Sequence, residues 1–262
     1  MKKLHIWIMA LALLALTLTP AAAQDERPLT VFAAASLSDA FAEIAAAFEA
    51  AHPGARVQFS FGGSSALATQ IEEGAPVDVF ASANLTQMQR VRDSGHIPNR
   101  PRVFARNRLV VITPADNPAG IETLADLAQP GLLLVLAAPD VPVRDYTEAM
   151  LELMAADPEY GPEFRDAVLA NLVSEEDNVR QVAAKVALGE ADAGVVYSSD
   201  VTPDIAGKVL RLDIPDAFNT LAEYPIARVA GSADPWLGWQ FIRFVLSAEG
   251  QAILAKWGFI TG

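Results

Sequence analysis

The chain alternates between strand-like and helix-like segments along nearly its whole length, and this alternation restricts the fold more than any other feature. Short apolar runs such as LTVF (29–32), VDVFASA (77–83) and LLLVLA (132–137) are followed by segments with helical or turn patterns. Strands that alternate with helices form parallel sheets covered by helices. The sequence therefore predicts an α/β fold with mainly parallel sheets flanked by helices.

The same alternation predicts strands and helices in the rest of the chain. Further strands are predicted at 56–61, 108–114, 193–199, 209–215 and 223–231, and helices at 37–50, 64–74, 85–95, 123–131, 147–156 and 175–191, with two more in 234–259 that are separated at Glu249. The Pro/Gly pairs between these segments are typical of turns.

The N-terminal segment, residues 1–23, has the pattern of a secretory signal. Lys2 and Lys3 precede an apolar run at 6–18, and small residues end in an A-x-A motif, so we expect cleavage after Ala23. No second apolar run approaches the length of a membrane span. The chain has no cysteine, which excludes disulfides, thiolate chemistry and a lipid-modified cysteine. These features predict a soluble protein exported to a periplasm.

The balance of charges limits the possible partners. The formal net charge is −13, and removal of the signal would leave 17 basic and 32 acidic residues, a charge of −15. An acidic protein is a poor ligand for nucleic acids and for anionic membranes. A small anion stays possible, because backbone N–H groups at helix N-termini can hold one locally.

Two serines follow small residues at the start of predicted helices. Ser36 comes after three alanines and has Asp39 three residues later, which is a capping pattern. Ser64 follows Gly62 and Gly63, and glycines allow the backbone to approach a ligand closely. Each serine is thus either an ordinary helix cap, with Ser64 or its neighbour Ser65 in that role, or an anion-binding hydroxyl.

Two more helix starts complete the set. One lies in the loop at 141–145, and the other has Asn178 as its expected cap with Gln181 at the capping-box position. Ligands of open α/β sheets bind beyond the carboxyl ends of the strands, where helix N-termini gather. The four starts indicate either a pocket of hydrogen-bond donors for an anion or four ordinary capped helices, and the pattern alone slightly favours the latter.

Five motifs carry a resemblance to a known family. VFAAASLSDAFAEIAAAFE, FSFGGSSALATQIEEGAPVDVFASAN, DVPVRDYTEAML, DNVRQVAAKVALGEADAGVVYSSD and GQAILAKWGF together resemble the periplasmic molybdate-binding proteins of ABC importers, from about residue 29 to the C-terminus. The resemblance implies a type II periplasmic-binding-protein fold, whose two lobes enclose an oxyanion in the cleft between them. It also implies delivery of molybdate or tungstate to a membrane permease with its ATPase.

The resemblance assigns the ligand positions residue by residue. They are the hydroxyls of Ser36, Ser64 and Tyr197 and the backbone amides of Val143 and Val179. It implies no enzymatic activity, no cofactor and no metal beyond the molybdenum oxyanion itself, and we expect a monomer. We expect one lobe to comprise 26–106 plus 224–262 and the other to comprise 107–223.

One position departs from the family pattern. Many relatives have glycine after VPA or VPV, where this chain has Arg144. An arginine restricts the backbone and places a cation near a helix N-terminus, where the helix dipole disfavours it. We expect its side chain either to turn away to Asp145 or to reach toward the anion.

The expected ligand groups are all donors, which suits an anion without a proton such as molybdate, tungstate or sulfate. Protonated phosphate would require an acceptor. Glu175, Glu176 and Asp177 lie close in sequence to Val179, although such acids more often stabilise a helix N-terminus. Sulfate, phosphate and an organic acid stay as alternative ligands of the same fold.

An enzyme is the rival class. The stretch GGSSA (62–66) resembles a nucleophile elbow, which would make Ser64 the nucleophile of a hydrolase. Apart from the signal, the chain has only His52 and His96, both in predicted turns, so a histidine base is not expected.

Tyr197 has an alternative role as well. It could be a core residue with a bonded hydroxyl and not a ligand of the anion.

Two further expectations concern structural roles. Asp78 is expected to cap or brace its own lobe. The aromatic side chains at 236, 239, 241 and 244 have the spacing of one helix face, so we expect Trp236, Trp239, Phe241 and Phe244 to pack in the core.

Overall fold

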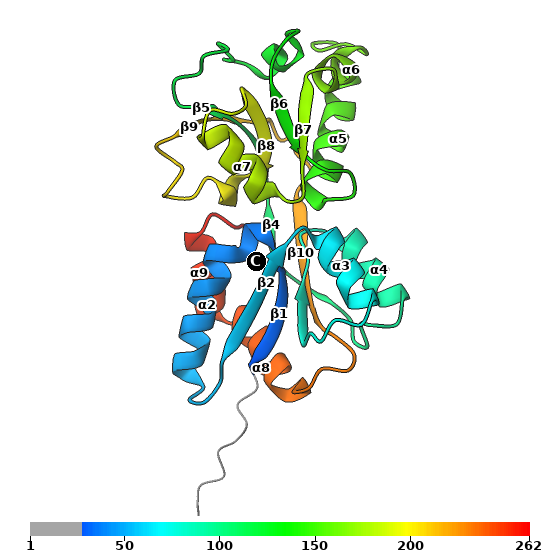
Figure 1. The fold of residues 1–262 in the computed structure, drawn as a ribbon, viewed down its shortest axis with the longest axis vertical. Helices are drawn as coiled ribbons and strands as arrows, with labels where there is room; N and C mark the ends of the chain where they lie inside the picture. The colour runs from blue at the N-terminus through cyan, green and yellow to red at the C-terminus, as the bar shows by residue number, and fades with distance from the viewer. Residues whose placement is uncertain (1–27) are drawn as a thin grey trace, which may run out of the picture.

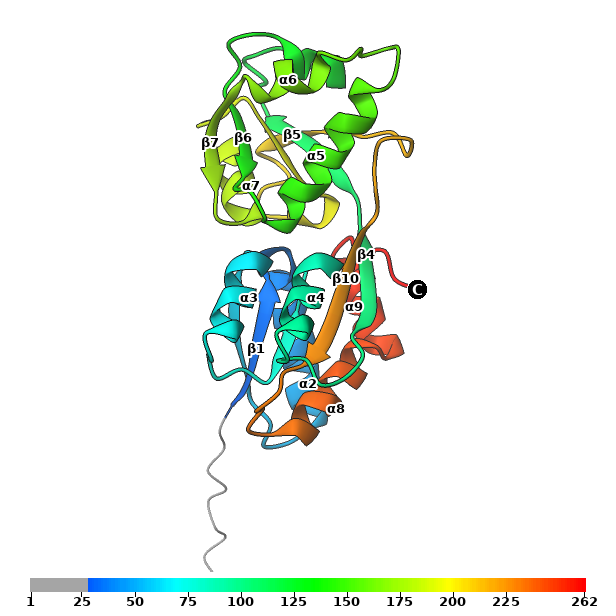
Figure 2. The ribbon, with the colours of Figure 1, turned by 90° about the vertical axis from the view of Figure 1, so that its right-hand side faces the viewer.

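The computed structural model describes residues 28–262, so the expected signal peptide lies outside the described residues. The chain forms two lobes, each built on a five-stranded sheet with helices packed against it (Figures 1 and 2). The predicted two-lobed α/β architecture is confirmed. Within residues 28–262 no helix is both long and apolar enough to cross a membrane.

The first lobe has the strand order β2-β1-β3-β10-β4. Its strands are β1 (Leu29–Ala34), β2 (Val57–Gly62), β3 (Val79–Ala81), β4 (Arg102–Asn107) and β10 (Ala222–Arg228). β1 pairs in parallel with β2 and β3, whereas β10 runs antiparallel to β3 and β4. The sheet is mixed because β10 enters it from the other lobe.

The second lobe repeats this plan with the order β7-β6-β8-β5-β9. Its strands are β5 (Leu109–Pro114), β6 (Leu134–Ala137), β7 (Leu172–Glu176), β8 (Ala193–Tyr197) and β9 (Val209–Asp213). β6 is parallel to β7 and β8, and β5 is antiparallel to β8 and β9. Here β5 is the strand that enters from the first lobe.

The chain passes between the lobes twice. β4 ends at Asn107 and β5 begins at Leu109, so the outward passage is a single residue, and the return runs from β9 to β10 (Figure 2). The side chain of Asn107 donates to Ser199 Oγ at 2.8 Å, and its Oδ1 accepts from Ser198 Oγ at 2.8 Å. These bonds tie the end of β4 to the end of β8.

The helices follow the strands in both lobes. The first lobe carries α2 (Ser38–Ala51), α3 (Ser64–Glu72), α4 (Leu85–Asp93), α8 (Pro235–Val245) and α9 (Ala248–Lys256), and the second carries α5 (Pro142–Ala155), α6 (Phe164–Leu169) and α7 (Val179–Ala187). Three short 3₁₀ turns, η1 (Ala35–Leu37), η2 (Leu124–Ala128) and η3 (Ser198–Asp200), complete the described elements.

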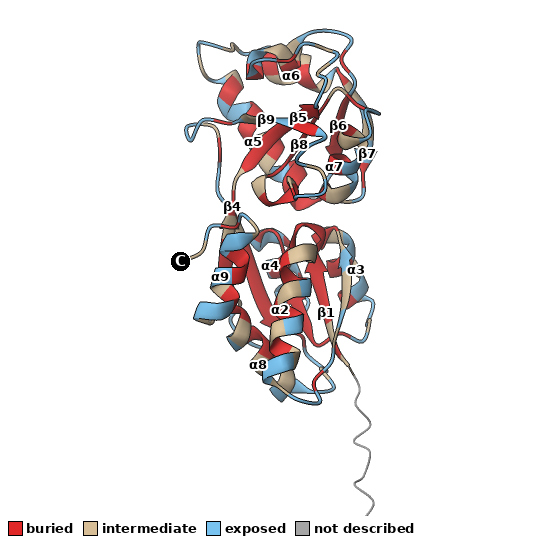
Figure 3. Cartoon of the chain, turned by 90° about the vertical axis from the view of Figure 1, so that its left-hand side faces the viewer, coloured by how far each residue is buried: buried red, intermediate tan, exposed pale blue. Residues whose placement is uncertain are grey.

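The core of the first lobe lies on both faces of its sheet. Along β1, Val31 packs with the residues of α2, and Phe32 packs with α3 and α4 on the opposite face, as the alternation of side chains in a strand requires. Figure 3 shows buried strands of this sheet behind α2. The ring of Phe241 in α8 meets Phe48 of α2 edge to face, with the centroids 5.4 Å apart. The C-terminal helices therefore belong to the first lobe.

α7 lies close to its sheet because β8 contains Gly194. A Cβ at that position would lie 2.8 Å from Cγ1 of Val182 and 3.0 Å from Cγ2 of Val186, which is closer than side chains pack. The glycine lets the apolar stripe of α7 approach β8 and β6, and this contact holds the N-terminus of α7 at the edge of the second lobe.

Several sequence predictions were wrong or incomplete. β4 and α6 were not predicted, and the expected helix at 123–131 is the short turn η2 with a Thr123–Asp126 capping box. Glu175 and Glu176 lie in β7 and not in the following helix, which begins at Val179.

The expected aromatic face of α8 is only partly buried. Trp236 is 63% exposed and Trp239 is 41% exposed, with their rings stacked 5.2 Å apart, so both predictions of core packing were wrong. Phe241 is fully buried, and Phe244 packs partly buried against the core. The aromatic residues of α8 therefore span a wider face of the helix than the sheet covers.

The prediction that Asp78 braces its own lobe is confirmed, because Oδ2 accepts from Thr30 N at 2.8 Å and Oδ1 from Ser232 Oγ at 2.6 Å.

Candidate functional site

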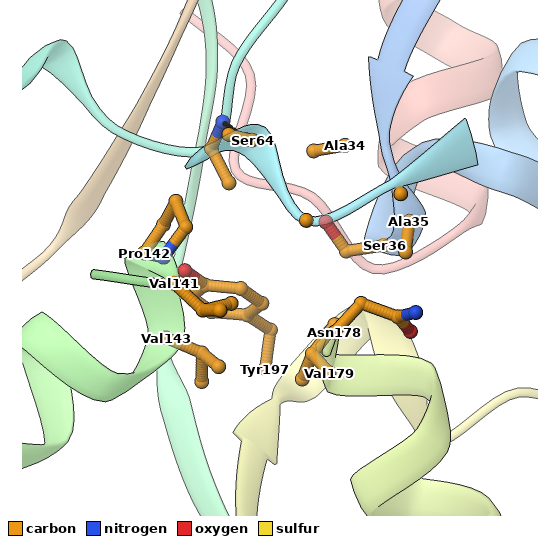
Figure 4. A pocket seen from close by; sticks show the side chains of 13 residues that line it. Ala34, Ala35, Ser36, Ser64, Val141, Pro142, Val143, Asn178, Val179 and Tyr197 are labelled. Carbon is orange, nitrogen blue, oxygen red and sulfur yellow. Dashed lines mark hydrogen bonds between the residues drawn. The ribbon is translucent and has the colours of Figure 1, made fainter. Parts of the chain in front are cut away.

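A pocket lies between the lobes, where the helix N-termini of both face each other (Figure 4). Its empty space is only about 210 Å³ even with the adjoining open solvent included, which limits an occupant to a small molecule or ion. It is lined by Ala34, Ala35, Ser36, Gly62, Gly63, Ser64, Ala83, Val141, Pro142, Val143, Asn178, Val179 and Tyr197. All five residues of the predicted ligand set are among them.

Ser36 does not cap a helix, so that prediction was wrong. It lies in the middle of η1, and α2 begins only at Ser38 with no side-chain cap. Because the residues before it are small, the 3₁₀ turn packs closely beside the pocket. Ser36 is therefore buried, with 2% of its surface exposed. Its Oγ lies 2.9 Å from the hydroxyl of Tyr224, which comes from the crossing strand β10. If Tyr224 donates to Ser36, the proton of Ser36 is available to the pocket.

Ser64 is the first residue of α3, and Gly63 is its cap position, so the capping prediction for Ser64 and Ser65 was also wrong. The Oγ atom of Ser64 accepts a hydrogen bond from the backbone N–H of Ala83 at 3.0 Å. This bond uses an acceptor site of the hydroxyl and leaves its proton free. The serine is thereby oriented as a donor toward the pocket.

The two backbone amides of the predicted set lie at helix N-termini of the second lobe. Val143 is the second residue of α5 and Val179 is the first residue of α7. N–H groups in a first helical turn have no acceptor within the helix. The predicted cap Asn178 is confirmed, and its side chain accepts from Arg180 N and Gln181 N, leaving the N–H of Val179 to the pocket.

Tyr197 ends β8 and brings its ring beneath the pocket (Figure 4). The residue is 1% exposed, and within residues 28–262 its buried hydroxyl has no hydrogen-bond partner. Burial raises the pKa of Tyr197 well above its ordinary value, so the hydroxyl keeps its proton. A buried hydroxyl without a partner is costly, ~1–3 kcal/mol, and this argues against a purely structural tyrosine.

Arg144 takes neither of the two expected directions. Its guanidinium Nη1 donates to the carbonyl of Ala137 at 3.0 Å and pairs with Glu175 at 2.8 Å, and Nε pairs with Glu148 at 2.9 Å. The side chain therefore lies along β6 and β7, away from the pocket. Asp145 instead accepts from Asn84 Nδ2 at 3.0 Å.

None of the lining residues carries a charged side chain. The nearby acids are engaged elsewhere: Glu175 pairs with Arg144, and Glu176 pairs with Lys185 at 2.6 Å. The expectation that these glutamates stabilise a helix N-terminus is corrected, because both belong to β7. The pocket thus offers neutral donors and no carboxylate acceptor.

The hydrolase alternative would need a histidine base beside Ser64. His52 Nδ1 is bonded to Phe48 O at 2.9 Å at the end of α2, and His96 Nδ1 lies 3.0 Å from Ser94 Oγ. Neither histidine lines the pocket that contains Ser64. Neither of these two histidines therefore stands as a base beside Ser64.

The lobes touch each other around the pocket. Asn84 of the first lobe donates to Asp145 of the second, and Gln87 Nε2 donates to Asp140 O at 3.1 Å. Arg180 of α7 reaches Asp39 of α2 at 2.8 Å. These contacts describe a closed arrangement in which the pocket is sealed on several sides.

Two residues beside the pocket were missed by the sequence reasoning. Tyr224 supports Ser36 from a strand 188 positions away, and Arg180 bridges the lobes. The pattern of 223–231 predicts only a strand, and DNVRQV predicts only a helix start, so no local signal indicated either role.

The chain matches known proteins along most of its length. The model of the family described as bacterial extracellular solute-binding protein matches residues 29–260. The molybdate-binding protein ModA of Mycobacterium tuberculosis (strain H37Rv) is 41% identical over 236 residues, which cover 90% of this chain and 85% of that protein. The protein of the same name from Escherichia coli (strain K12) is 32% identical over 242 residues, 90% of each chain.

Solved structures agree with this fold. The periplasmic molybdate-binding protein of Azotobacter vinelandii has a TM-score of 0.76 at 21% identity, covering 89% of this chain and 99% of that chain. The sulfate-binding protein SubI of Mycobacterium tuberculosis H37Rv has a TM-score of 0.78 at 20% identity, covering 88% and 86%. Such low identities show the fold alone, which is the expected type II arrangement. With the sequence matches they confirm the resemblance: the chain belongs to the bacterial extracellular solute-binding proteins, within the group of molybdate-binding proteins.

Proposed function

We propose that this protein captures molybdate, and also tungstate, in the cleft between its lobes. The observation that carries the proposal is the buried Tyr197 hydroxyl, which has no hydrogen-bond partner in the described part of the chain and belongs to a pocket lined by neutral donors. A tetrahedral oxyanion without a proton fits such a pocket because it accepts hydrogen bonds and donates none. The relatives that share the chain's sequence are named for molybdate binding.

Each lobe supplies part of the proposed ligand shell. The hydroxyls of Ser36 and Ser64 come from the first lobe, and the amides of Val143 and Val179 and the hydroxyl of Tyr197 come from the second. A hydrogen bond to a charged group contributes ~1.5–3 kcal/mol, so an anion bonded to both lobes stabilises their closed arrangement.

The donor set favours the proposed ligands over phosphate because of their protonation state. Sulfate has the same protonation state as molybdate, so only its size distinguishes it. Protonated phosphate would need an acceptor, and no lining residue provides a carboxylate. Sulfate is unprotonated and smaller than molybdate. Because donors fixed by the backbone of two packed lobes cannot contract onto a smaller ion, sulfate is expected to bind much more weakly.

The proposed cellular role follows from this capture. The protein acts in the periplasm, after removal of its signal, as a monomer that presents the oxyanion to the permease of an ABC importer with its ATPase. It needs no cofactor and performs no catalysis. The proposed lobes are 26–106 plus 224–262 and 107–223, and the passages between β4 and β5 and between β9 and β10 serve as the hinge.

Calorimetric titration of the mature protein with molybdate, tungstate, sulfate and phosphate tests the proposal. We expect tight binding of molybdate and tungstate without proton uptake, weak binding of sulfate and no measurable binding of phosphate. Sulfate binding as tight as molybdate binding would overturn the molybdate assignment and leave the fold untouched.

A further inference from the structure

Arg180, next to the lining residue Val179, forms ion pairs with two aspartates and a hydrogen bond with one carbonyl oxygen. Its Nη2 lies 2.8 Å from Asp39 Oδ2 and donates to the carbonyl oxygen of Ser36 at 3.4 Å, and its Nε lies 2.8 Å from Asp200 Oδ1. Asp39 and Ser36 belong to the first lobe, whereas Asp200 belongs to the second. One guanidinium therefore bridges the cleft.

The same network reaches two residues of the proposed ligand shell. Asp200 is fully buried, and its Oδ2 accepts from the backbone N–H of Tyr197 at 3.1 Å. On the other side of the cleft, Arg180 holds the peptide carbonyl of Ser36 within η1. Arg180 itself does not line the pocket, so it acts through these neighbours and not on the anion.

Some contacts of Arg180 can persist when the lobes separate, whereas others must break. Asp200 lies in the same lobe as Arg180, and their ion pair can persist in an open arrangement. The contacts with Asp39 and Ser36 cross the cleft and must break. The side chains of Arg180 and Asp39 are 24% and 39% exposed, so after opening both charged groups can be hydrated. The Arg180–Asp39 pair is thus specific to closure.

We propose that Arg180 is a positioning residue that latches the closed lobes over the bound oxyanion by pairing with Asp39, with Asp200 orienting its guanidinium. This inference rests on the proposed oxyanion function and adds a determinant of how long the anion is held. Because the latch forms only after the lobes meet, it slows ligand release and leaves capture by the open protein unchanged.

The test measures molybdate association and dissociation rates by stopped-flow protein fluorescence, together with the melting temperature of the ligand-free protein. Asp39→Asn keeps the shape of the side chain and removes its charge. We expect its dissociation rate to rise roughly 2- to 5-fold with the association rate unchanged. The ligand-free melting temperature should fall slightly, because Asp39 is the acid in the first turn of α2.

Glu43→Gln is the matched control. Glu43 is another acid of α2, but it pairs with Lys256 at 2.8 Å inside the first lobe. Its loss can lower the melting temperature, and the dissociation rate should stay at the wild-type value. Equal increases in dissociation rate for both variants would show a general effect of charge on α2 and overturn the latch.

A double-mutant cycle identifies the partner. Arg180→Lys keeps a cation beside Asp200 but loses the planar group that reaches Asp39 and Asp200 together. With the latch already lost in Asp39→Asn, adding Arg180→Lys should raise the dissociation rate by less than it does in the wild type. Independent, multiplicative effects overturn the pairing.

The outcomes also separate this inference from the function on which it rests. A wild-type protein that binds none of the tested oxyanions overturns the proposed function and the latch with it. A wild-type protein that binds molybdate, with Asp39→Asn releasing it at the wild-type rate, overturns the latch alone.

Discussion

Gly63 in the first lobe and Asp177 in the second approach each other so closely that no side chain fits between them. A Cβ on Gly63 would lie 2.5 Å from the carbonyl oxygen of Asp177, a distance that real Cβ contacts essentially never show. The backbone of Gly63, with φ −62° and ψ 133°, is one that any residue adopts. The glycine is therefore required by the facing lobe and not by its own turn.

Gly63→Ala should consequently impair closure without disturbing the lobe that carries it. We expect molybdate affinity to fall by on the order of 10-fold or more, because the lobes can no longer bring both halves of the donor set to the anion. The ligand-free melting temperature should not change. Gly207→Ala is the control, since its Cβ would meet nothing within 4 Å and the residue does not line the pocket. Wild-type affinity in Gly63→Ala would contradict a closed state with this geometry.

Tyr197→Phe should change stability and affinity in unequal ways. The hydroxyl has no partner within the described chain, so its removal should leave the ligand-free protein as stable as the wild type or more stable. If the hydroxyl donates to the anion, affinity should drop roughly 10- to 150-fold, the equivalent of ~1.5–3 kcal/mol. Thermal melting and calorimetry measure the two quantities. A loss of stability with unchanged affinity would mean that the tyrosine is only structural.

Ser36→Ala should weaken binding to a similar extent, although the serine is not a helix cap. The hydroxyl of Tyr224 lies 2.9 Å from Ser36 Oγ. If Tyr224 donates in this bond, it leaves the serine proton to the pocket, and Tyr224→Phe should then reproduce part of the loss. Ser38→Ala, at the first residue of α2, is the control and should bind molybdate normally. Similar affinities for Ser36→Ala and Ser38→Ala, measured by calorimetry, would remove Ser36 from the ligand set.

Asp200 should make stability depend on pH in the acidic range. Burial is the main cause that raises the pKa of Asp200 from 3.8 to about 6, although Arg180 opposes the shift. The folded-state pKa exceeds the unfolded value, so this contribution to stability is complete below about pH 4 and is lost as the pH rises to about 6. The shift corresponds to an effect on the order of 3 kcal/mol.

The measurement compares urea unfolding of the wild type and Asp200→Asn from pH 4 to pH 7. The asparagine variant cannot titrate at this position, so the stability of the wild type relative to the variant should decrease across that interval. Other acids titrate equally in both proteins and cancel in the comparison. A constant difference between the two proteins would show that Asp200 does not titrate in this range.

Much of the fold and of the candidate site follows from local features of the sequence. The alternation of strand and helix patterns determined the α/β class, because periodicity depends only on residues a few positions apart. Asn178 was identifiable as a cap for the same reason. Small residues and serines after strands indicated where donors gather, and all five predicted ligand residues line one pocket.

Only the tertiary structure decided what each of these groups contacts. Ser36 meets Tyr224 188 positions away, Arg144 turns to Glu175 in β7, and the hydroxyl of Tyr197 finds no partner among the described residues. Trp239 is exposed although its spacing is that of a core face. Local sequence sets which backbone conformation a segment prefers, whereas the partner of a buried polar group depends on which distant segments the packing of two sheets and two lobes brings beside it.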